Sequence, residues 1–156
     1  MVTRLSPDAK MLLTSAAAEA RRRGDRRLGT DHLLLGLLHD PDSSVARALG
    51  VDLEAARTAS ESLDRAALAA VGVNVSHLGT PRPAIFARRL PSLSSGARAV
   101  LSAAVEQARR AKTQPIQTRD FLLALLARES PDPAAELLAA MGVERSQVRD
   151  RLGGAA

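Results

Sequence analysis

The chain has 156 residues, a formal net charge of +5 and no cysteine. This length allows one domain or two small halves that share a core, and the lack of cysteine excludes disulfides, thiol catalysis and cysteine-based metal sites. Aromatic residues make up 1% of the sequence, and its apolar residues are mainly Ala, Leu and Val, which favours helices. No apolar run reaches the roughly 18 residues of a membrane span, and the first residues lack the pattern of a secretion signal, so we expect a cytoplasmic protein.

The first half of the chain predicts four helices. The expected starts are Ser6, Thr30, Asp40-Pro41 and Asp52, and the first three helices are expected to end near Gly24, Asp40 and Gly50. Ser, Thr and Asp side chains accept hydrogen bonds from the free N–H groups of a first helical turn, and Pro suits that turn. Gly closes a helix in the left-handed conformation.

The second half predicts the same order of elements. Helices are expected from Ser94 to about Lys112, from Thr118 to about Arg128, from Pro131 and Pro133 to Met141, and around Val148 and Leu152. Between the halves, residues 60–78 form an extra helical segment, and residues 79–93 contain three prolines, which are typical of a loop or linker. We therefore divide the chain into a first repeat (1–59), an insert (60–92) and a second repeat (93–156), which together form one unit.

The two halves are also related in sequence. Residues 5–38 and 93–126 align without a gap at an offset of 88, with 13 identities in 34 positions. The identical pairs include Leu5/Leu93, Ser6/Ser94, Leu13/Leu101, Arg22/Arg110, Thr30/Thr118 and Leu34/Leu122. A duplicated helical unit predicts two structurally similar halves.

The positive charge comes almost entirely from arginine. Arginines cluster at residues 21–23, at residues 26 and 27, and at residues 88 and 89. A solvated face with contacts at helix ends is the simplest interpretation, and a basic nucleic-acid-binding regulator is one alternative. That alternative predicts binding that falls steeply with salt, but two Phe and no Trp or Tyr leave little for base stacking. A structural oligomerisation module is a further alternative.

The sequence shows no arrangement for catalysis. Glu19, Glu54 and Glu61 are expected on polar helix faces and form no acid–base pair. His32 and His39 lie seven residues apart, without a third ligand spaced to complete a zinc site. The chain also lacks the Gly-x-x-x-x-Gly-Lys-Ser/Thr loop that binds nucleotide phosphates. We expect a protein that is not an enzyme and that needs no metal or cofactor.

Several segments together resemble a known family. They are Leu5-Ser6-Pro7-Asp8-Ala9, Glu19-Ala20-Arg21-Arg22, Gly29-Thr30-Asp31-His32-Leu33-Leu34-Leu35-Gly36-Leu37-Leu38 and Ala46-Arg47-Ala48-Leu49-Gly50-Val51-Asp52. The combination closely resembles the Clp repeat, two copies of which form the N-terminal domain of Clp/Hsp100 ATPases of the ClpC and ClpA type. The resemblance implies an all-α, pseudo-twofold domain of two four-helix repeats. In that family the domain receives substrates and adaptors for an unfoldase that feeds a protease.

The resemblance also implies candidate sites. In some ClpC-type relatives each repeat holds a phosphorylated arginine, with an acidic residue on the guanidinium and a hydroxyl at a helix start near the phosphate. By position, the first repeat offers Ser6, Thr30 and Asp31, and the second offers Ser94, Thr118 and Arg119. An arginine at the acidic position would repel a guanidinium, so at most one such site is expected, in the first repeat. Ordinary helix capping is the alternative interpretation of these residues.

The proline-rich stretch supports one further hypothesis. Ile85 and Phe86 lie among arginines, as in an unfolded substrate, and would form a built-in plug between the halves. The function favoured by the sequence is a peptide- or protein-binding module that acts as an adaptor, modulator or ligand sequesterer of a Clp protease. Its expected partners are unfolded or arginine-phosphorylated proteins, Clp ATPase or protease components, adaptors and cyclic peptides, with neither nucleic acid nor membrane. The sequence leaves open whether the chain is free-standing or part of a larger ATPase.

Overall fold

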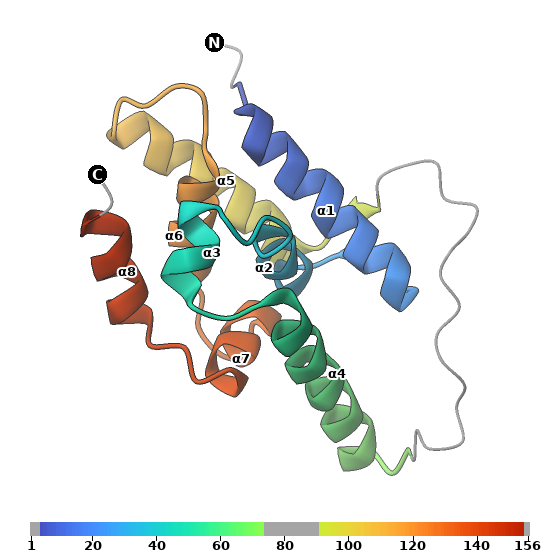
Figure 1. Ribbon diagram of the computed structural model, residues 1–156. Helices are drawn as coiled ribbons and strands as arrows, with labels where there is room; N and C mark the ends of the chain where they lie inside the picture. The colour runs from blue at the N-terminus through green and yellow to red at the C-terminus, as the bar shows by residue number, and fades with distance from the viewer. Residues whose placement is uncertain (1–3, 74–90, 155–156) are drawn as a thin grey trace.

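The computed structural model describes residues 4–73 and 91–154, and the regular secondary structure there is almost entirely helical (Figure 1). The helices are α1 (Pro7–Arg23), α2 (Thr30–Leu37), α3 (Ser44–Leu49), α4 (Leu53–Ala70), α5 (Ser95–Arg110), α6 (Thr118–Leu126), α7 (Pro133–Ala140) and α8 (Arg145–Gly154). Two short strands, β1 (Arg27–Leu28) and β2 (Ser92–Leu93), complete the described elements. The expected all-α fold with four helices in each half is confirmed.

The helix starts follow the sequence signals at most positions. Ser6 and Ser94 cap α1 and α5, and each side-chain oxygen accepts a hydrogen bond at 3.1 Å from the backbone N–H three residues on. Thr30 and Thr118 were expected to cap their helices, and this prediction is wrong. Each is the first helical residue, and Gly29 and Gln117 occupy the cap positions. The Thr30 hydroxyl is thereby free to bond outside its own helix.

The two repeats are joined by a pair of symmetric backbone contacts. The parallel strands β1 and β2 place Leu28 opposite Leu93, and an isolated parallel bridge places Leu5 opposite Ile116. Because residues 5 and 93 correspond at the offset of 88, as do residues 28 and 116, each contact is the pseudo-twofold image of the other. Strands of two residues carry no detectable period, so the sequence did not predict them.

The core lies where the central helices of the two repeats meet. The most extensive contacts join α1 to α2 and α5 to α6, and α2 also contacts α4, α5, α6 and α7. The leucines of α2 and α6 are buried almost without exception. Burial of these side chains is the main source of stability that the sequence provides.

Helix α4 differs from the expected organisation. It runs without a break from Leu53 to Ala70, so the boundary placed at residue 59 falls inside it. The start of the predicted insert is therefore the second half of α4, which extends away from the helical body in Figure 1. The described part of the chain contains no helix that is both long and apolar enough to cross a membrane.

Gly36 allows the close approach of α1 and α2. A Cβ atom on Gly36 would lie 2.9 Å from the Leu12 carbonyl oxygen and 3.0 Å from the Ala16 nitrogen, both backbone atoms of α1. We predict that Gly36→Ala lowers the free energy of unfolding by about 1–3 kcal/mol, because the helices must separate. Urea unfolding measures this, with Gly153→Ala as the control because a Cβ there meets nothing within 4 Å. Equal stabilities of the two variants would contradict the predicted clash.

Candidate functional site

An apolar pocket opens between the two repeats. Its volume is about 150 Å³, and it is lined by Leu13, Leu28, Leu33, Pro91, Leu93, Ala97, Leu101 and Phe121. We call it the seam pocket. Two pairs of lining residues, Leu13 with Leu101 and Leu33 with Phe121, correspond at the offset of 88, so the pocket lies at the pseudo-twofold axis. No charged side chain lines it, and its size suits one aliphatic or aromatic side chain of a ligand.

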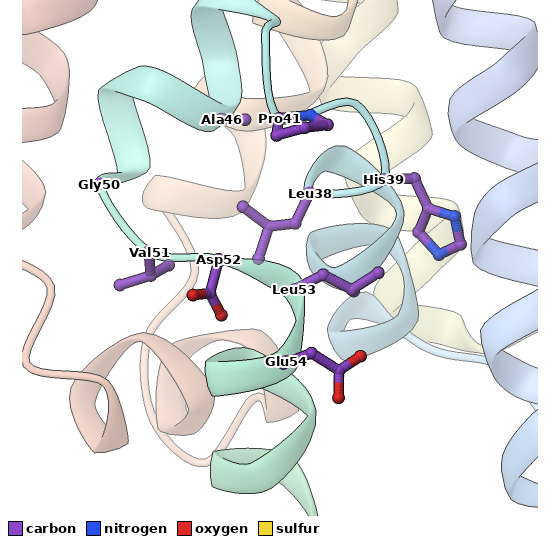
Figure 2. Close-up of a pocket in the computed structure, with 9 residues that line it drawn as sticks. All are labelled: Leu38, His39, Pro41, Ala46, Gly50, Val51, Asp52, Leu53 and Glu54. Carbon is purple, nitrogen blue, oxygen red and sulfur yellow. The ribbon is translucent and has the colours of Figure 1, made fainter.

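A second, more open groove lies between the end of α2, α3 and the start of α4 (Figure 2). Its volume is about 620 Å³, and its lining mixes apolar side chains such as Leu38 and Leu53 with the polar groups of His39, Asp52 and Glu54. The polar groups already have partners. Asp52 accepts the Ala55 N–H at 2.7 Å, Glu54 pairs with Arg57 at 2.6 Å, and His39 lies 2.8 Å from Glu19. This groove therefore offers apolar contacts, and its polar side chains already have partners within the chain.

The candidate hydroxyl residues are arranged crosswise between the repeats. The Ser6 backbone N–H donates to the Ile116 carbonyl at 2.8 Å, two residues before Thr118. The Ser94 backbone N–H donates to the Leu28 carbonyl at 2.9 Å, two residues before Thr30. Each serine therefore lies close to the turn before the threonine of the other repeat. The sequence analysis had instead grouped the serine and threonine of the same repeat.

Thr30 and Asp31 already have partners within the chain. Thr30 is buried, its hydroxyl donates to Asp132 Oδ1 at 2.7 Å, and it accepts the Ala134 N–H at 3.1 Å. The Asp31 carboxylate forms an ion pair with Arg23 Nη1 at 2.6 Å, and both side chains are 14% exposed. The first-repeat candidates thus bind groups of the protein itself.

The second-repeat candidates form no comparable cluster. Ser94 caps α5, Thr118 is partly buried, and Arg119 is exposed on the first turn of α6. Asp120 completes this helix start, because its carboxylate accepts the Gln117 N–H at 2.9 Å. The plug residues Ile85 and Phe86 lie outside the described residues.

Glu19 is a buried charge that the sequence interpretation misplaced. It was expected on a polar face, but its side chain is 1% exposed and lies among Arg22, His39 and Arg57. Arg57 bonds it most closely, at 2.6 Å through Nη2 and at 3.2 Å through Nε. Burial alone would raise the pKa of Glu19, but the hydrogen bonds from Arg57, His39 and Arg22 and the charge of Arg57 lower it to about 2. The sequence signal for the burial of Glu19 was its apolar neighbours, because Ala17 and Ala20 are both buried.

His32 completes the start of α2. Its Nδ1 accepts the Gly29 N–H at 2.9 Å, so the proton is assigned to Nε2, which lies 2.7 Å from Asp25. This is the counterpart of the Asp120 bond to Gln117 in the second repeat, since residues 32 and 120 correspond. Within residues 4–73 and 91–154, no group of His, Asp and Glu side chains is placed to hold a metal ion.

Two four-helix repeats around one axis, joined by parallel strand contacts, match the architecture that the sequence resemblance implied. A family model described as the Clp repeat N-terminal domain matches residues 4–81. The chain belongs to this family. Its similarity to single proteins extends further, because the rice chloroplastic chaperone ClpC2 is 29% identical over 97% of the chain. The Bacillus subtilis negative regulator of genetic competence ClpC/MecB is 27% identical over the same share.

Solved structures show the same fold. The N-terminal domain of ClpD from Arabidopsis thaliana has a TM-score of 0.70 at 21% identity, with 98% of both chains covered. The Hsp104 N-terminal domain from Candida albicans has a TM-score of 0.65 at 17% identity, with 98% of this chain and 93% of that chain covered. The chain spans only 15% of the length of the rice relative and 17% of the Bacillus relative.

Proposed function

We propose that this Clp N-domain binds unfolded polypeptide or adaptor segments through the seam pocket and carries out no catalysis. The observation that carries the proposal is an uncharged cavity at the pseudo-twofold axis, lined by apolar residues of both repeats. Concave apolar sites of this kind are the usual binding sites of folded domains. Unfolded chains expose apolar side chains that folded proteins bury, so such a pocket selects them.

The proposed partners follow from this chemistry and from the family. They are unfolded proteins, adaptor segments and apolar cyclic peptides, which would compete for one pocket. As part of a Clp machine the domain would deliver these ligands to the ATPase. As a separate protein it would act as an adaptor or would sequester them.

The test is binding of a permanently unfolded probe, fluorescein-labelled reduced and carboxymethylated α-lactalbumin, followed by fluorescence anisotropy. We predict that Leu13→Asp and Leu101→Asp each weaken binding at least about tenfold, because a carboxylate in an apolar pocket loses its hydration. Both residues are partly buried at the pocket. The affinity of the wild-type domain should change little with salt, since the contact is apolar.

Met11→Asp is the matched control. Met11 lies on α1 two residues from Leu13 and is 62% exposed, outside the pocket lining. Circular dichroism shows whether each variant remains helical. Binding by Leu13→Asp as tight as that of wild type, or an equal loss in Met11→Asp, would contradict the seam pocket as the binding site.

The nucleic-acid alternative receives little support from the arginine cluster. Arg22 pairs with Glu19 and Glu61, and Arg23 pairs with three aspartates, so these two charges are neutralised locally. Arg26 and Arg27 are exposed. A nucleic-acid site needs a row of cations that face the phosphates, and the cluster provides few of them.

A further inference from the structure

Arg23 lies in an acidic enclosure that the peptide-binding function does not use. Its Nε is 3.1 Å from Asp25, its Nη1 is 2.6 Å from Asp31, and its Nη2 is 2.9 Å from Asp64. The Ser60 hydroxyl adds a contact to Nη1 at 3.1 Å. Each of the three guanidinium nitrogens thus faces a carboxylate, and Nη1 and Nη2 donate hydrogen bonds to Asp31, Ser60 and Asp64.

The enclosure carries more negative charge than one arginine needs. Three carboxylates surround a single guanidinium, and one of them, Asp25, also lies 2.7 Å from His32 Nε2. The pKa of Asp64 is raised by burial and, against the lowering effect of Arg23, by the neighbouring charges of Asp31 and Asp25. The pKa of Arg23 is also raised, because the carboxylates outweigh the effect of burial. A site with this charge would accept another guanidinium if Arg23 were absent.

The arrangement is peculiar to the first repeat. At the offset of 88, Ala111 stands at the position of Arg23, and Arg119 stands at the position of Asp31. Neither the internal guanidinium nor its main carboxylate therefore has a counterpart in the second repeat. The shared fold of the two repeats therefore does not require the enclosure.

Thr30, the residue before Asp31, binds an anionic group of the protein itself. The Asp132 carboxylate accepts hydrogen bonds from the Thr30 hydroxyl and from the Ala134 N–H, and Arg128 lies 3.0 Å from its other oxygen. A Cβ on Gly96, in the first turn of α5, would lie 3.2 Å from Asp132 Oδ2 and 3.2 Å from the Thr30 methyl group. Adjacent residues at the start of α2 thus bind one internal cation and one internal anion.

We propose that Arg23 is a built-in occupant of the guanidinium position beside Asp31 and that it excludes arginine or phosphoarginine side chains of a ligand from the first repeat. That the excluded side chain belongs to a bound polypeptide rests on the proposed function, whereas the internal occupancy does not. An intramolecular group competes at a high effective concentration, typically millimolar or above. Arg23 is therefore a specificity-determining residue, which leaves the seam pocket to bind apolar ligands.

The experiment replaces Arg23 and supplies its guanidinium from solution. The variant Arg23→Ala is titrated with methylguanidinium chloride at roughly millimolar concentrations while its thermal unfolding midpoint is measured. A saturable rise of the midpoint is expected, because a ligand that binds only the folded state stabilises it. Methylammonium, which lacks the forked donor geometry, should raise the midpoint less.

Two controls keep the result interpretable. Arg26→Ala removes an exposed arginine three residues away and should show no saturable rise. Adding Asp31→Asn to Arg23→Ala should abolish the rise. If Arg23→Ala fails to fold, Arg23→Gln retains most of the side-chain stem and takes its place. Equal responses of the Arg23 and Arg26 variants would overturn the proposal.

A binding measurement tests whether Arg23 excludes phosphoarginine from the first repeat. Fluorescein-labelled casein phosphorylated on arginine should bind Arg23→Ala at least about tenfold more tightly than wild type, while unphosphorylated casein should not distinguish the two proteins. Equal binding of phosphorylated casein to both proteins would overturn the exclusion. Failure of casein to bind the seam variants differently from wild type would count against the proposed function alone.

Discussion

Replacing Phe121 by alanine should lower the free energy of unfolding by about 3–5 kcal/mol. Phe121 heads the largest fully buried side chains, has an exposed fraction of 0%, and lines the seam pocket where α6 meets the first repeat. Truncation removes the apolar area that the ring buries. It also leaves a cavity that joins the seam pocket, and the surrounding side chains fill such a cavity only in part. Urea unfolding followed by circular dichroism measures the loss.

The symmetric variant provides the control for this prediction. Leu33 occupies the corresponding place in the first repeat and is 1% exposed. Leu33→Ala should cost about 2–5 kcal/mol, and the two changes should not be additive because both residues line one cavity. A loss below about 1 kcal/mol for Phe121→Ala would mean that the two repeats are not held together at this axis.

Replacing Glu19 by glutamine should lower the free energy of unfolding by roughly 3 kcal/mol at neutral pH. The buried Glu19 carboxylate on α1 pairs with Arg57 on α4 and with His39, which follows α2 in the chain. Glutamine keeps the shape of the side chain but loses the negative charge that Arg22, His39 and Arg57 contact. Denaturant unfolding at pH 7 measures the loss. Glu61→Gln is the control, because the exposed pair of Glu61 with Arg22, at 3.5 Å, should contribute under about 1 kcal/mol.

The same carboxylate predicts a pH dependence. The pKa of Glu19 is lowered from 4.5 to about 2 in the folded protein. Its contribution is therefore complete above about pH 4.5, where the carboxylate is ionised in both states, and it is lost as the pH falls toward 2. The difference between wild type and Glu19→Gln should shrink across this window. A difference that stays constant from pH 7 to pH 2 would show that the charge of Glu19 is not what stabilises the fold.

The helical scaffold could be predicted because its signals are local. Capping by Ser6 and Ser94 depends on residues within one turn, and the stop at Gly24 depends on the left-handed conformation that its φ of 76° confirms. The duplication also predicted the symmetry, since identical leucines recur on α2 and α6. Thr30 misled the prediction because a hydroxyl before a helix resembles a cap whether or not it bonds its own helix.

The charged networks could not be predicted because they join distant segments. Glu19 meets Arg57 across 38 positions, and Thr30 meets Asp132 across 102. Neither pairing leaves a periodic pattern, and a run of arginines at the end of a helix has the same sequence signature whether it faces solvent or an acidic enclosure. The crosswise placement of Ser6 and Ser94 likewise depends on how the repeats pair, which local signals do not specify.

The seam pocket is the central claim, and methyl NMR tests it most directly. Leucine methyl groups of the domain are labelled, and the unlabelled unfolded α-lactalbumin probe is titrated in. The account predicts that the largest shifts occur at Leu13, Leu93 and Leu101, which line the pocket. Shifts confined to Leu38 and Leu53 of the open groove, with the seam leucines unchanged, would contradict it.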